Sequence, residues 1–135
     1  MSVIIEQTYN AAVEKVWKAL TDKDQMKQWY LDLAAFEAKV GFEFSFTGGP
    51  KSFVHLCKVM EVIPGKKIAY SWRFEGFEGD SLVSFELFPE GENTRIRLTH
   101  SGIETFFKSM GFDRNNFEPG WTYLIDTQLK EFVEK

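Results

Sequence analysis

Histidine and cysteine are the side chains of this sequence best suited to acid–base or nucleophilic chemistry, and the chain has two histidines and one cysteine. His100 ends a run in which Ile96 and Leu98 alternate with polar residues, so the alternation of a strand places its imidazole on the apolar face. An inward imidazole at a strand end could hydrogen-bond a ligand carbonyl or act as a general base. The alternative is a core histidine that is satisfied by a backbone carbonyl.

The other two side chains, His55 and Cys57, share one face of a second predicted strand with Phe53. Val54 and Leu56 make the opposite face apolar as well, so the pattern leaves open which face is inward. A cysteine becomes a nucleophile only beside a base in an electropositive site, and no motif supplies one, so Cys57 is interpreted as a packing residue. Two histidines and one cysteine on different strands lack the close spacing of zinc ligands, and we predict no metal and no cofactor.

Catalysis would need a second group beside His100, and the sequence does not place one. Most carboxylates, such as Glu43 and Glu86, fall on the solvent side of their strands. The glycine-rich run Gly48–Lys51 lacks the spacing and the following helix of a phosphate-binding loop, and is interpreted as a hairpin turn. No residue is assigned a catalytic role, and a small cyclase or hydrolase built on His100 stays an alternative.

Hydrophobic periodicity predicts the elements that position these side chains. Alternating apolar and polar residues predict seven strands: Val3–Tyr9, Leu33–Lys39, Phe42–Thr47, Phe53–Ile63, Lys67–Glu75, Asp80–Phe88 and Thr94–His100. Two short helices follow the first strand: Ala12–Leu20, and a second one that Asp22 caps and that ends near Trp29. With a helix at the end of the chain, this order predicts an α+β fold with an antiparallel sheet.

The last 20 residues, Asn116–Lys135, are predicted to form one long amphipathic helix with Pro119 in its first turn. Its apolar residues recur at steps of three and four: Phe117, Trp121, Leu124, Ile125, Leu129, Phe132 and Val133. Gln128 interrupts this stripe. A buried amide needs partners, which His100, a ligand or a water could supply, although a position at the margin of the stripe explains Gln128 equally well.

A long helix on a curved sheet either fills the groove or encloses a pocket, and the aromatic share of 16% fits a rich core or a ring-lined pocket. The candidates for lining such a pocket share inward positions on their predicted elements. They are Phe42, Phe44, Phe46, His55, Tyr70, Trp72, Phe85, Leu87, Ile96, Leu98, His100, Trp121, Leu124, Ile125 and Gln128.

Chain length, net charge and cysteine content limit which partners and which cellular location are expected. A chain of 135 residues is expected to form one domain over residues 1–135. The net charge is −4 and no basic stripe is present, so a nucleic-acid partner is not expected. The chain has neither an apolar run of 18 residues nor a signal peptide, and its one cysteine fits a reducing compartment, so we expect no membrane association and a cytoplasmic location. The oligomeric state has no signal in the sequence.

Short motifs along nearly the whole chain stand in a distinctive order. They are Ala11–Trp17, Ala19–Asp22, Trp29, Glu61–Pro64, Tyr70–Trp72, Leu98–Gly102 and Gly120-Trp121. The first three, after a strand, are similar to the opening of the START-like or Bet v 1-like superfamily. The others resemble its bacterial branch called Activator of Hsp90 ATPase homologue 1-like.

This resemblance implies a helix-grip fold, in which about seven antiparallel strands wrap around the C-terminal helix and two small helices close one end. Members commonly enclose a hydrophobic cavity between the sheet and the helix. The functions known in the superfamily include lipid transfer, hormone binding, polyketide cyclisation and assistance to the Hsp90 chaperone, and the fold alone does not choose among them. We therefore predict a binder of a small apolar or amphipathic ligand, with a chaperone-associated interaction module as the alternative.

Overall fold

The computed structural model describes residues 2–48, 53–106 and 114–135, with only the backbone described at 114–116. Its elements are β1 (Ser2–Tyr9), α1 (Val13–Thr21), α2 (Lys23–Trp29), β2 (Glu43–Gly48), β3 (Phe53–Ile63), β4 (Lys67–Phe74), β5 (Ser81–Glu90), β6 (Asn93–Ser101), the 3-10 turn η1 (Ile103–Thr105), α3 (Arg114–Tyr123), the π-helical turn η3 (Leu124–Gln128) and α4 (Leu129–Val133). Part of the predicted hairpin turn at Gly48–Lys51 lies outside the described residues.

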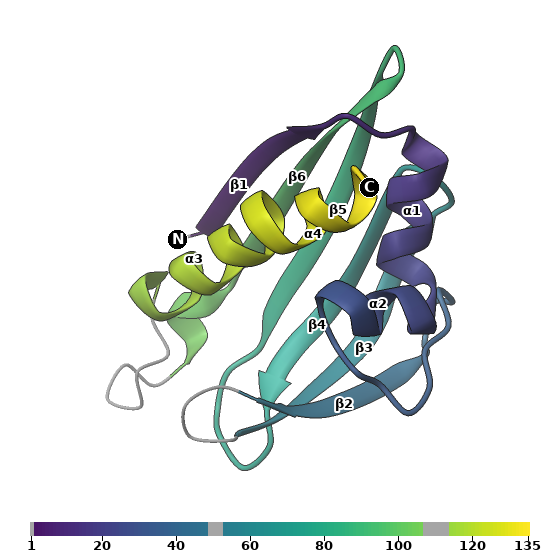
Figure 1. Cartoon of the computed structure of the whole chain (residues 1–135). Coiled ribbons are helices and arrows are strands. Elements are labelled where there is room, and N and C mark those ends of the chain that lie inside the picture. The colour runs from purple at the N-terminus through teal and green to yellow at the C-terminus, as the bar shows by residue number, and fades with distance from the viewer. Residues whose placement is uncertain (1, 49–52, 107–113) are drawn as a thin grey trace.

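The six strands form one antiparallel sheet in the order β1-β6-β5-β4-β3-β2. The C-terminal helix, made of α3, η3 and α4, lies across β1, β6 and β5, and α1 and α2 lie on the same side of the sheet (Figure 1). This arrangement confirms the predicted α+β class and the helix-grip architecture.

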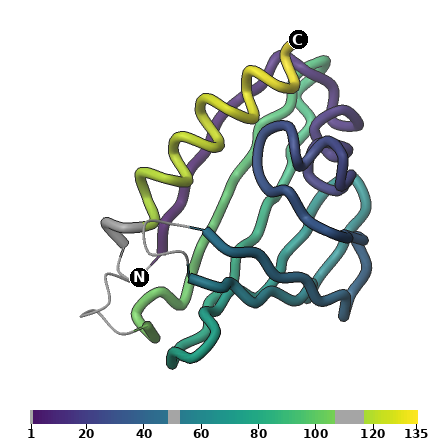
Figure 2. The backbone as a smooth tube through the Cα atoms, turned by 60° about the horizontal axis from the view of Figure 1, so that its bottom comes forward, coloured from purple at the N-terminus to yellow at the C-terminus, as the bar shows by residue number. Residues whose placement is uncertain are grey.

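The far end of the C-terminal helix is fixed against the start of α1. Figure 2 shows the helix running alongside β1 until the C-terminus reaches α1. There the backbone N–H of Asn10 donates to Glu134 at 2.7 Å, and the Lys15 ammonium donates to the Lys135 carbonyl at 2.8 Å. These contacts hold the helix over the sheet at the end that α1 and α2 cover.

Two turns and one helix cap can be traced to their residues. Lys66 N–H donates to the Ile63 carbonyl at 2.8 Å, and Gly65 between them has a φ of +76°, so Pro64 and Gly65 occupy the two central positions of a type II turn, which suit proline and glycine. In the β5–β6 hairpin, Glu90 pairs with Asn93, so the loop is shorter than the five residues expected from the sequence. Asp22 accepts from two N–H groups at the start of α2, which confirms the predicted cap.

The predicted strand Leu33–Lys39 is wrong, because this segment is irregular and the sheet has six strands instead of seven. Its buried residues, Leu33 and Phe36, are three positions apart, and a strand would need a spacing of two. Phe36 packs edge-on against Phe44, so the segment still contributes to the core.

The C-terminal helix begins at Arg114, earlier than predicted, so Pro119 lies in the second turn and not in the first. A one-turn π-helical stretch interrupts the helix: Leu129 N–H donates to the carbonyl of Leu124, five residues back. Beside it, the buried Tyr9 hydroxyl donates to the Ile125 carbonyl at 2.6 Å. A side chain of β1 thus supports the backbone of the helix at its widened turn.

Candidate functional site

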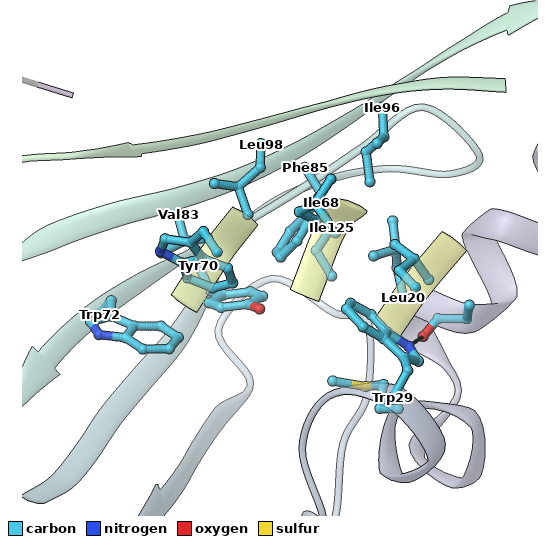
Figure 3. Packing of buried hydrophobic residues seen from close by; sticks show 14 of the residues in the cluster. Leu20, Trp29, Ile68, Tyr70, Trp72, Val83, Phe85, Ile96, Leu98 and Ile125 are labelled. Carbon is cyan, nitrogen blue, oxygen red and sulfur yellow. Dashed lines mark hydrogen bonds between the residues drawn. The ribbon is translucent and has the colours of Figure 1, made fainter. Parts of the chain in front are cut away.

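The alternation of β4 turns Tyr70 and Trp72 toward the C-terminal helix, and Trp72 lies near the end of that strand. Figure 3 shows these two side chains among the buried residues between the sheet and the helix. Trp72 pairs with Cys57 on one neighbouring strand and Ser81 on the other. The β4 register therefore places a tryptophan in the centre of the aromatic interior.

Four other rings lie around the Trp72 indole, and each comes from a different element. The ring centroids are 5.2 Å away for His55, 5.3 Å for Phe46, 5.4 Å for Trp121 and 5.7 Å for His100. Edge-to-face and tilted contacts of this kind are favourable for rings at such distances. We call Trp72 and these four rings the Trp72 cluster.

Both nitrogens of His100 are hydrogen-bonded inside the protein. The Trp121 indole N–H donates to Nδ1 at 3.0 Å, which makes Nδ1 an acceptor and places the ring proton on Nε2. Nε2 then donates to Ser81 Oγ at 2.8 Å, and the Ser81 hydroxyl donates to the Trp72 carbonyl at 2.6 Å. His100 is therefore a satisfied core histidine, as in the second interpretation, but its partners are side chains and not a backbone carbonyl.

This network argues against a catalytic role for His100. Its side chain is fully buried, and burial lowers the pKa of the imidazole to about 3. A general base that works near neutral pH needs a pKa near that pH and a free nitrogen that faces the substrate. His100 meets neither requirement, and its two hydrogen bonds hold Trp121 and Ser81 in place.

The Trp72 indole N–H is the exception in this interior. Trp72 is 6% exposed, and within the described part of the chain its Nε1 has no hydrogen-bond partner. An unpaired buried donor costs roughly 1–3 kcal/mol, and such groups are rare in native proteins. The cluster therefore contains one polar group whose hydrogen-bonding capacity is unused.

The hydroxyls of Tyr30 and Tyr70 form another polar contact of the interior, and they are 2.6 Å apart. Burial raises the pKa of both phenols well above the usual value, so both stay protonated. One hydroxyl donates to the other, which leaves the second proton for a further acceptor. In Figure 3 the indole nitrogen of Trp72 lies on the side of its ring turned away from the Tyr70 hydroxyl.

His55 occupies the β3 side of the Trp72 cluster. It is 7% exposed and stacks on the half-buried Phe46, with centroids 4.4 Å apart. Its Nδ1 lies 3.0 Å from the Phe53 carbonyl, which can only accept, so Nδ1 carries the ring proton. Burial lowers the pKa of this imidazole, which favours its neutral form.

Cys57 is buried, and burial raises the pKa of its thiol to about 12. Because the thiolate is the reactive form, we predict that dithionitrobenzoate does not label the native protein at pH 8 and labels one thiol per chain in denaturant. Fast native labelling at a rate like that of free cysteine would contradict the packing role.

Within residues 2–48, 53–106 and 114–135, no group of three or more His, Cys, Asp and Glu side chains could hold a metal ion. None of the helices described there is long and apolar enough to cross a membrane.

Comparison with known protein families identifies the family of this chain. The profile described as Activator of Hsp90 ATPase homolog 1-like protein matches residues 10–134. The chain belongs to this family. The predicted resemblance is thereby confirmed. No curated protein matches the chain.

Solved structures share the fold of this Activator of Hsp90 ATPase homolog 1-like protein over nearly its whole length. Protein MLL2253 from Mesorhizobium loti is 26% identical with a TM-score of 0.84, and the match covers 98% of this chain and 96% of that one. CalU16 from Micromonospora echinospora is 28% identical with a TM-score of 0.78, covering 98% and 75%. The Aha1 dimer from Colwellia psychrerythraea is 23% identical with a TM-score of 0.77, covering 99% and 97%, and at this identity it shows the fold alone.

The structure of this family member gathers the predicted lining residues in one interior. Eleven are buried: Phe44, His55, Tyr70, Trp72, Phe85, Leu87, Ile96, Leu98, His100, Trp121 and Ile125. Phe42, Phe46, Leu124 and Gln128 are half-buried. The His55 face, which the pattern left open, is inward. Their role in binding a ligand stays a prediction.

Gln128 fits a position at the margin of the helix stripe better than a buried amide with hydrogen-bond partners. It lies in η3, half-buried, and the described structure gives its amide no hydrogen bond to His100 or to another residue.

On the outer side of the C-terminal helix, a shallow groove of about 510 Å³ is lined by Glu118, Pro119, Thr122, Tyr123, Asp126 and Thr127. This groove faces away from the Trp72 cluster, because Trp121 and Ile125 form the buried face of the helix.

Two polar residues of the interior were missed from the sequence. Ser81, the partner of His100, is in phase with Val83 and Phe85, so strand parity would have found it. Tyr30 follows the last residue of α2 in a non-helical conformation, so no periodic pattern extends to it. Its position is set by stacking on Trp29, with centroids 4.8 Å apart, and by its bond to Tyr70.

Proposed function

We propose that this family member binds a small apolar or amphipathic molecule between its sheet and its C-terminal helix, against the Trp72 cluster. The observation that carries the proposal is the buried, unpartnered indole N–H of Trp72. A bound molecule that carries an acceptor would recover the hydrogen bond that the protein leaves unmade. Docking to a chaperone stays a prediction that rests on the family description alone.

The surroundings of Trp72 suit an apolar molecule. Its ring neighbours present faces and edges, and the polar atoms of His100, Ser81 and Trp121 are already paired with one another. Apart from the acceptor, a ligand placed here meets mainly aromatic surface, which favours burial of apolar area at about 25 cal/mol per Å².

Phe46 is the side chain through which we expect such a molecule to reach the indole. It is the half-buried member of the Trp72 cluster and lies on β2, the last strand of the sheet. The other four members are at least nine-tenths buried. Rotation of the Phe46 side chain therefore exposes Trp72. It gives up less buried side-chain surface than movement of any other ring of the cluster.

The proposal predicts where a bound apolar probe acts. We expect Nile red to bind with micromolar affinity and to shift the indole ¹⁵N–¹H resonances of Trp72 and Trp121, assigned by single Trp→Phe variants. Trp17, half-buried on α1, serves as the matched control, and its resonance should stay in place. Saturable binding that shifts only surface resonances, or no binding of this or other apolar probes, would remove the proposed site.

A further inference from the structure

The polar groups of the interior specify the chemistry of the ligand more narrowly than apolar character alone. We infer that the site at Trp72 selects a neutral aromatic molecule with a carbonyl-type acceptor, and discriminates against carboxylates such as fatty acids. This inference rests on the proposed function and adds to it the charge and the hydrogen-bonding group of the ligand.

The demand for an acceptor comes from the unpaired donor. Trp72 Nε1 carries a proton and no lone pair, so it can only donate. The Tyr30–Tyr70 pair has two hydroxyl protons and uses one within the pair. The Trp72 N–H and the remaining tyrosine proton are both donors, so a ligand oxygen without a proton is their complement.

The preference for a neutral ligand comes from the absence of a compensating charge. Among the described residues, the buried polar side chains are His55, Ser81, Thr94 and His100, and none is Lys, Arg, Asp or Glu. Both imidazoles are held neutral because burial lowers their pKa. A carboxylate carried into this interior would lose its hydration without gaining a cation, which is strongly unfavourable.

The aromatic preference comes from the geometry of the Trp72 cluster. His55 meets Trp72 edge-on at an interplanar angle of 79°, Phe46 does so at 68°, and Trp121 is tilted by 58°. These rings present both edges and faces, so a planar molecule that replaces Phe46 against the indole can form the same types of ring contact. A flexible alkyl chain has no face to offer.

Three probes with one naphthalene ring test the inference: 6-propionyl-2-(dimethylamino)naphthalene and two analogues in which a carboxylate or a propyl group replaces the propionyl group. We expect the ketone to bind the wild-type protein about tenfold or more tightly than the other two. In Trp72→Phe its advantage over the propyl analogue should vanish, whereas Trp17→Phe should keep it. Equal binding of the ketone and the propyl analogue would overturn the donor role while leaving the proposed function standing.

The other outcomes are also decisive. A carboxylate that binds best would overturn the neutral preference, and failure of all three probes would contradict the proposed function itself.

A second measurement needs no variant and so does not depend on Trp72→Phe folding. The infrared carbonyl band of the ¹³C-labelled bound ketone should lie at lower wavenumber than in a hydrocarbon solvent, as expected for a hydrogen-bonded carbonyl. A band at the hydrocarbon position would refute the contact.

Discussion

Replacing Trp121 by alanine is expected to lower the free energy of unfolding by about 3–5 kcal/mol, the range seen when a large buried aromatic is truncated. Trp121 is 4% exposed, and its ring contacts Tyr30, Trp72 and Phe85. The substitution removes these contacts and also leaves His100 Nδ1 without its donor. Denaturant titration of wild type and variant measures the difference.

Tyr123 provides the matched control, since it lies two residues further along the same helix and is 56% exposed. Tyr123→Ala should change the free energy of unfolding by no more than about 0.5 kcal/mol. Trp121→Phe keeps a ring and deletes the donor, so it should fall between the two. If Trp121→Ala proved as mild as Tyr123→Ala, the helix would not be seated on the sheet as described.

Side-chain direction within strands could be predicted from the sequence, because the period of a strand is fixed at two. The inward positions of Ile96, Leu98 and His100 follow from alternation alone, and all three are fully buried. The same rule applies to Trp72. The fold class and most of the candidate site were therefore accessible without coordinates.

Hydrogen-bond partners could not be predicted in the same way. Those of His100 come from Ser81, 19 residues before it, and Trp121, 21 residues after it. Which atoms meet depends on the register of β5 against β6 and on the rotation of the C-terminal helix. Neither quantity has a local signal, so the sequence could indicate only that an inward histidine needs partners.

Local irregularities were missed because tertiary contacts set them. Alternation predicted a strand at Leu33–Lys39, although its buried residues, Leu33 and Phe36, are spaced by three, and Phe36 packs on Phe44 of β2. The π-helical turn of the C-terminal helix lies beside a hydrogen bond from Tyr9, 116 residues away. Propensity describes neighbours along the chain, and these features depend on neighbours in space.

Acidification is expected to destabilise the protein already between pH 6.5 and 5. The pKa of His100 falls from an ordinary value of 6.5 to about 3 on burial. Between these values the unfolded chain binds a proton that the folded protein does not, so stability falls as the pH falls. The slope is about 1.4 kcal/mol per pH unit, which gives a loss of about 2 kcal/mol between pH 6.5 and 5 from this residue alone. His55 acts in the same direction, because burial also lowers its pKa.

Denaturant titrations at a series of pH values measure this slope, and variants assign it. The double variant His55→Gln, His100→Gln should lose most of the dependence between pH 6.5 and 5, whatever its absolute stability. Glu6→Gln should leave that interval unchanged, since the Arg97 and Arg95 guanidiniums hold the pKa of Glu6 below its usual value. In the folded wild type, the ring protons of His100 should show no titration between pH 8 and 5. A midpoint near 6.5 would mean that the imidazole is hydrated, and the His100 network that positions Trp121 beside Trp72 would then be absent.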